Sequence, residues 1–223
     1  MEPIFFILSI LPDLAKGVLT TLEISVASFA LGMALAVILA PIRVFAPPPF
    51  SLVARAYIEM FRGTPLLVQL LFIYFGLPAI GVRLDAYSAC VLVIGLNSAA
   101  YQAEIIRSAM KSIPETQFLA AESLGFSTAQ TYRYVVLPQA MRVAVPAFVN
   151  ELVTLIKESS LASVIGVVEL TRRGEYLVAY TFRALEVYAA VALIYFALCT
   201  LASQAVRVLE KRLRIPGYER AVA

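Results

Sequence analysis

The chain has 223 residues, of which 61% are hydrophobic and only 15% are charged, a balance typical of proteins with several membrane spans rather than of soluble globular domains. The formal net charge is +3, and because no basic run is interleaved with aromatic residues, nothing indicates nucleic-acid binding. Histidine is absent, and Cys90 and Cys199 lie within apolar stretches. We therefore expect no metal site, no disulfide framework and no redox chemistry.

Several apolar stretches are long enough to cross a hydrocarbon core of about 30 Å at about 1.5 Å per residue. They are residues 18–40, 64–82, 86–106, 143–168 and 187–206. We therefore predict an all-α membrane protein with about five transmembrane helices, forming a single domain over residues 1–223. The short apolar segment 4–11 is expected to be an interfacial helix, and the prolines at 47–49 a stiff loop.

Lysine and arginine are distributed unevenly between the two sides of this arrangement. One side carries Arg43, Arg55, Arg62, Arg107, Lys111, Arg133, Arg142, Arg207, Lys211, Arg212, Arg214 and Arg220. The other carries Lys16, Arg83, Arg172, Arg173 and Arg183. Because cytoplasmic loops of membrane proteins are enriched in basic residues, we expect the N-terminus outside and the C-terminal tail, residues 207–223, in the cytoplasm.

Residues 112–142, here called the elbow, are too polar to cross a bilayer and too regular for a slack loop. Pro114 suits the start of a helix, and Gly125 suits the left-handed turn that ends one. Ser127 and Gln130 have capping-box spacing for a second helix, which is expected to end at the following Leu-Pro pair. The sequence predicts two short helices on the cytoplasmic side, serving either as a docking surface or as a hairpin that merely covers the span ends.

Four motifs follow one another along the chain. They are FRGTPLLVQ at 61–69, YQAEIIR at 101–107, an elbow motif made of Leu119-Ala120-Ala121, Leu124-Gly125 and Val136-Leu137-Pro138, and KESSLASVIG at 157–166. Together they resemble the permeases of binding-protein-dependent ABC importers, in particular the polar amino acid subfamily, over roughly residues 20–214. The chain departs from the family pattern at Leu119, where glutamate is usual, and Glu122 is the candidate to replace it.

The resemblance implies that the elbow is a coupling loop that contacts a separate ATPase subunit. Its coupling residues would be Leu119, Ala120, Ala121, Glu122, Leu124 and Gly125. No G-x-x-x-x-G-K-[ST] phosphate loop is present, so we expect no enzyme activity and no cofactor in this chain, with ATP and magnesium bound by the ATPase partner. A bend at Gly63, Thr64 and Pro65 is expected to contribute to a gate.

The resemblance also implies the surroundings of the protein. The expected assembly lies in a bacterial inner membrane and works by alternating access. Its other members would be an identical or homologous permease subunit, two cytoplasmic ATPase subunits and an extracytoplasmic solute-binding protein.

Polar groups inside the apolar stretches indicate a lined cavity, because they are unfavourable in hydrocarbon without a partner or water. The candidate substrate-binding residues are Asn97, Tyr101, Glu104, Lys157, Glu158 and Ser159. Lys157 would hold the carboxylate of an amino acid and Glu104 or Glu158 its ammonium group, near a break in the fourth span. Glu151 is interpreted as a structural partner of a lysine.

Carboxylates outnumber lysine among these intramembrane groups, which predicts a substrate with a cationic side chain, such as arginine, lysine or histidine. The alternatives are a permease for another small polar solute, such as glutamine, glutamate or an opine, and a channel outside the ABC class. An enzyme is disfavoured, because neither a nucleophile with its base nor a metal-binding set is present.

Overall fold

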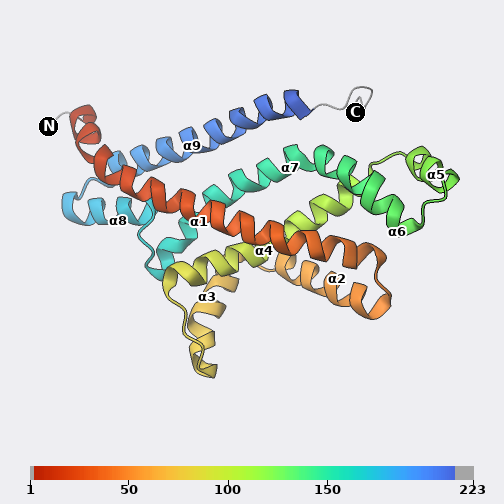
Figure 1. Ribbon diagram of the computed structural model, residues 1–223. Coiled ribbons are helices and arrows are strands. Elements are labelled where there is room, and N and C mark those ends of the chain that lie inside the picture. Colours follow the sequence, from red (N-terminus) through yellow and green to blue (C-terminus); the bar gives the residue numbers. More distant parts are fainter. Residues whose placement is uncertain (1–2, 214–223) are drawn as a thin grey trace.

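The computed structural model describes residues 3–213, and every regular element in this range is helical (Figure 1), which confirms the predicted all-α class. The elements are α1 (Pro3–Phe45), α2 (Pro48–Gly63), α3 (Leu66–Gly76), η1 (Leu77–Ile80), α4 (Ala86–Lys111), α5 (Glu115–Ser123), α6 (Thr128–Thr131), η2 (Tyr132–Val136), α7 (Leu137–Glu158), η3 (Ser159–Ile165), α8 (Leu170–Thr181) and α9 (Ala184–Leu213). Of the expected C-terminal tail, residues 207–213 continue α9, and residues 214–223 lie outside the described range.

Four of the expected spans are long helices in the described part of the chain. The helices long and apolar enough to cross a membrane are Phe5–Phe45, Ala86–Lys111, Thr128–Ile165 and Ala184–Gln204. The expected span at 64–82 differs, because α3 has only 11 residues, or about 16 Å of helix. It forms a pair with α2 that is bent by 104°, and counting this broken pair as one span gives five.

The N-terminal segment 4–11 is helical, and it forms the first turns of α1 rather than a helix of its own. α1 is continuous over 43 residues. Phe6, Ile10 and Leu14 recur every four residues on one face of this helix, and they are buried against α8 and α9. Packing of this face on α8 and α9 attaches the first turns of α1 to the bundle.

Two prolines that were expected to interrupt the chain lie instead at helix starts. Pro48 opens α2, where a missing backbone N–H leaves no hydrogen bond unmade. Pro138 lies in the first turn of α7, which follows η2 without a break. η2 is a π-helix, whose wider turn accommodates the proline. The second elbow helix therefore continues into the fourth span instead of ending at Leu137.

α4 is the central helix of the described bundle. In its most apolar window 67% of the residues are buried, against 17 to 28% in the other candidate spans. It packs on α1, α2, α3 and α7. The contact with α1 is close, since a Cβ on Gly95 would lie 2.7 Å from Leu31 Cδ2. Small residues at such a crossing allow two membrane helices to approach.

The long helices give the molecule two ends (Figure 1). The N-terminal part of α1, α8 and the beginning of α9 lie at one end. The elbow helices α5 and α6 lie at the opposite end, close to the start of α7. The elbow and α8 are therefore separated by the length of the bundle.

Candidate functional site

The elbow has the predicted local structure as far as residue 131. α5 ends before Gly125, whose φ of 81° is left-handed. The N–H of Phe126 then donates to the carbonyl of Ala121 at 3.1 Å, which satisfies one of the last carbonyls of α5. The capping box is also present: the Ser127 N–H donates to Gln130 Oε1 at 2.9 Å, and the Gln130 N–H donates to Ser127 Oγ at 3.4 Å. These predictions are confirmed.

The predicted coupling residues gather around the turn between α5 and α6. The side chains of Leu119 and Leu124 are 55% and 78% exposed. Ala120 and Glu122 are also exposed, whereas Ala121 is buried beneath the turn. The turn thus presents two exposed leucines beside the left-handed Gly125.

Aromatic contacts connect the elbow to the spans. The rings of Phe118 in α5 and Tyr132 in η2 have centroids 5.1 Å apart, and the ring of Phe45 at the end of α1 lies 4.0 Å from Tyr132. α5 therefore contacts Tyr132 at the beginning of the fourth span, and Tyr132 in turn contacts the last turn of α1.

The bend between α2 and α3 falls at the predicted residues, and side-chain amides hold it. α2 ends at Gly63, and Pro65 precedes α3. Gln69 Nε2 donates to the carbonyl oxygens of Phe61 at 2.8 Å and Thr64 at 3.0 Å. Asn97 Nδ2 of α4 donates to the same Phe61 carbonyl and to Gln69 Oε1, both at 3.0 Å. Asn97, a predicted substrate ligand, thus fixes the bend to α4.

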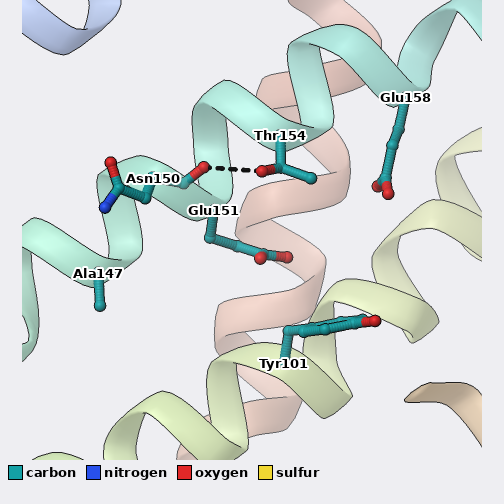
Figure 2. Close-up of a pocket in the computed structure, with 6 residues that line it drawn as sticks. All are labelled: Tyr101, Ala147, Asn150, Glu151, Thr154 and Glu158. Carbon is teal, nitrogen blue, oxygen red and sulfur yellow. Dashed lines mark hydrogen bonds between the residues drawn. The ribbon is translucent and has the colours of Figure 1, made fainter. Parts of the chain in front are cut away.

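A pocket of about 330 Å³ lies between α4 and α7. It is lined by Tyr101, Ala147, Asn150, Glu151, Thr154 and Glu158. Figure 2 shows Glu151 and Glu158 projecting from α7 toward α4, with the ring of Tyr101 opposite them. The pocket thus brings together two of the predicted substrate residues, Tyr101 and Glu158.

The pocket is acidic and has no internal counter-charge. Among the described residues, neither Glu151 nor Glu158 forms an ion pair with a lysine or arginine. Ser98 Oγ donates to Glu151 Oε1 at 2.6 Å, so Glu151 is held by a hydroxyl rather than by the lysine that the sequence suggested. Two carboxyl groups facing one cavity can bind a cation or a cationic group of a ligand.

The predicted break in the fourth span is confirmed, because α7 ends at Glu158 and continues as the 3-10 helix η3. The two other candidates at the break do not line the pocket. The side chain of Lys157 is exposed. Ser159 is buried, and its hydroxyl donates to the carbonyl of Ile156 at 2.8 Å.

Glu104 lies outside the pocket, in an arginine cluster. Arg43 Nη1 of α1 donates to Glu104 Oε2 at 2.8 Å, and Arg107 donates to Glu104 Oε1. All three side chains are about one-fifth exposed. A further arginine, Arg62, lies over the ring of Tyr101 at 5.2 Å from its centroid. Glu104 joins α1 to α4, and we place no substrate contact on it.

Glu151, Asn150, Thr154 and Ala147 were missed as pocket residues, although the sequence carries a signal for them. With Glu158 they follow the spacing of one helix face along α7. This stripe is recognised only when the polar residues of α7 are considered together as one helix face. Among residues 3–213, no cluster of three or more His, Cys, Asp or Glu side chains could hold a metal ion.

Residues 32–215 match the family described as binding-protein-dependent transport system inner membrane component. The chain is 44% identical to the probable amino-acid ABC transporter permease protein PatM of Vibrio harveyi, over 86% of this chain and 87% of that protein. It is 42% identical to the glutamine transport system permease protein GlnP of Escherichia coli (92% and 94% covered). It is 38% identical to the arginine transport system permease protein ArtQ of Bacillus subtilis (92% and 94% covered).

The fold is also that of solved ABC importers. A crystal structure of an amino acid ABC transporter with histidines superposes with a TM-score of 0.89 at 38% identity, covering 93% of this chain and 97% of that one. The MetNI methionine ABC transporter, with a TM-score of 0.78 at 23% identity and coverage of 93% and 99%, shares the fold.

These matches define the class of the protein as an inner-membrane, multi-pass permease subunit of a binding-protein-dependent importer. The chain belongs to this family, and within it to the amino-acid ABC transporter permeases.

Proposed function

We propose that this permease carries amino acids with a cationic side chain, arginine, lysine or histidine. The acidic pocket between α4 and α7 is the observation that supports this most. An amino acid needs one acceptor group for its α-ammonium, and the pocket offers both Glu151 and Glu158. The second carboxylate is then available for a guanidinium, ammonium or imidazolium group.

The relatives point to more than one substrate, since their names include glutamine and arginine. The pocket also carries the amide of Asn150 and the hydroxyl of Thr154, which suit a neutral polar side chain. A glutamine permease is therefore the second candidate, and a direct comparison of the two substrates separates them.

In the proposed mechanism, two permease subunits, identical or homologous, form the translocation path by alternating access. Two ATPase subunits bind ATP and magnesium and contact the exposed turn around Leu119 and Leu124. An extracytoplasmic binding protein delivers the amino acid. We propose that the elbow and the C-terminus lie in the cytoplasm and the N-terminus outside, which the distribution of basic residues supports.

The test is uptake into proteoliposomes that contain the permease with its ATPase and binding protein. We expect ATP-dependent accumulation of labelled arginine, lysine or histidine, with a higher kcat/KM than that of glutamine. Preferred uptake of glutamine would select the second candidate, and uptake without the ATPase would indicate a channel. The permease alone is expected to hydrolyse no ATP.

A further inference from the structure

A buried chain of hydrogen bonds leads from α1 through α4 to the pocket. The side-chain nitrogen of Gln102 donates to the backbone carbonyl of Phe29 in α1 at 3.2 Å and to Ser98 Oγ at 2.8 Å. Ser98 Oγ donates to Glu151 Oε1 at 2.6 Å. Gln102 and Ser98 are fully buried and Glu151 is 9% exposed. We call these three residues the relay.

The donors and acceptors of the relay have one consistent direction. Gln102 faces two acceptors, the Phe29 carbonyl and Ser98, so its NH₂ group rather than its oxygen must point toward them. Ser98 has a single hydroxyl proton, and because its oxygen already accepts from Gln102, that proton is directed to Glu151. One oxygen of Glu151 is therefore held as an acceptor.

α1 also shapes the relay through a glycine. A Cβ on Gly32 would lie 2.8 Å from Gln102 Nε2 and 3.1 Å from Ser98 Cβ. Glycine at this position leaves room for the amide of Gln102 beside the α1 backbone. The close crossing of α1 and α4 thus sets the position of a hydrogen-bond donor that acts on α7.

We propose that Ser98 and Gln102 are positioning residues that hold one oxygen of Glu151 and leave the rest of its carboxylate facing the pocket, and that they thereby set the preference for cationic amino acids. The inference rests on the proposed function, and it adds two residues that do not line the pocket. A carboxylate that rotates freely would bind a cationic group less well, since part of the binding free energy would be used to order it.

The experiment measures binding to the purified permease–ATPase complex without the binding protein, so that only the permease pocket selects. Labelled arginine and glutamine are compared by equilibrium dialysis for the wild type, Ser98→Ala and Gln102→Met. We expect Ser98→Ala to lower the arginine-to-glutamine affinity ratio by about tenfold, as loss of a hydrogen bond to a charged group would. Gln102→Met leaves the serine in place and should lower the ratio less.

The matched control is Ser28→Ala, because Ser28 is also a buried serine whose hydroxyl joins α1 to α4, donating to the Val91 carbonyl at 3.3 Å. Its affinity ratio should remain that of the wild type. An unchanged ratio in both relay variants, or an equal loss of arginine and glutamine binding, would overturn the relay.

Binding to the wild-type complex tests the proposed function separately from the relay. A wild-type complex that does not prefer arginine over glutamine would overturn the proposed substrate class, and the relay's role in selectivity with it. A wild-type complex that prefers arginine, with relay variants that keep this preference, would overturn the relay alone. If Ser98→Ala yields no folded complex, Gln102→Met decides.

Discussion

Two regions of the bundle place glutamate inside apolar helices and satisfy it in opposite ways. Glu104 receives hydrogen bonds from two arginines, Arg43 and Arg107, and joins α1 to α4. Glu151 and Glu158 face the pocket between α4 and α7, with no ion pair among the described residues. The same residue type is thus a structural link in one region and an available ligand in the other.

The difference shows that the role of a carboxylate inside a membrane helix cannot be assigned from the residue type alone. Its desolvation must be offset, either by protein cations or by water and ligand in a cavity. The partner decides the role, and one partner of Glu104, Arg43, is 61 residues away in the sequence. Two substitutions should separate the two regions, and two further substitutions should leave both of them intact.

The largest effect is expected for Glu104→Gln. It leaves two partly buried arginines without their carboxylate, and we expect the permease to lose about 2 kcal/mol or more of stability. Arginine and glutamine transport should fall together, because the pocket is untouched. Thermal unfolding in detergent measures the first effect, and paired uptake assays measure the second.

Glu59→Gln is the matched control for that change, because Glu59 pairs with Arg55 on an exposed helix face. It should leave thermal unfolding unchanged, since exposed ion pairs contribute little. A selective loss of arginine uptake in Glu104→Gln would contradict this interpretation and indicate that Glu104 contacts the substrate.

The next largest effect is expected for Glu158→Gln. Loss of one charge-assisted hydrogen bond to a cationic side chain should lower arginine uptake about tenfold relative to glutamine uptake. Thermal unfolding should change little, because no protein cation loses its partner. Glu175→Gln, a carboxylate on α8 outside the pocket, should keep the wild-type ratio. Equal loss for both substrates in Glu158→Gln would contradict the comparison.

A smaller effect is expected when both glutamate regions are left intact and the elbow is strained. Gly125→Ala places a Cβ at a φ of 81°, which should destabilise the turn by about 1 kcal/mol. Transport and recovery of the complex with the ATPase should both decrease, with an unchanged arginine-to-glutamine ratio.

The control for the elbow is Gly76→Ala, since a Cβ there meets only Phe72 at an ordinary 3.9 Å and φ is −86°. It should transport normally. Wild-type transport and complex recovery in Gly125→Ala would remove the left-handed turn from the proposed coupling.

The smallest effect is expected at Asp85, an exposed carboxylate that caps α4. The Ser88 N–H donates to Asp85 Oδ1 at 3.0 Å, and hydrogen bonding with Ser88 holds the pKa of Asp85 below its usual range. A lowered pKa means that the stabilisation is present above the ordinary aspartate pKa and is lost as pH falls through the lowered value. Asp85→Ala should lower the Tm slightly at neutral pH, and the difference from wild type should vanish in acid.

Several features that depend only on neighbouring residues could be predicted from the sequence. The capping box of Ser127, the left-handed Gly125 and the end of α7 near Glu158 were all read correctly. Each is decided within one or two turns of chain, where residue type and spacing act directly on the backbone.

Features that depend on distant partners could not be predicted in this way. Glu104 was predicted to be a substrate ligand. Its ion pair with Arg43 connects α1 to α4, and the sequence alone does not reveal such a pair. Asn97 was read in the same way, although its amide supports the bend at Phe61. The bend at Gly63, Thr64 and Pro65 was predicted, but not that 64–82 would form only the second part of a helix pair bent by 104°.

The sequence by itself determined the apolar helices, their caps and the turn of the elbow, because hydrophobic length and local hydrogen bonding depend on consecutive residues. Only the tertiary structure decided which polar groups pair and which face the pocket. Packing of α4 against α1 and α7 assigns Arg43 to Glu104, and Ser98 to Glu151. Burial inside a membrane requires such partners, and residues far apart in the chain supply them.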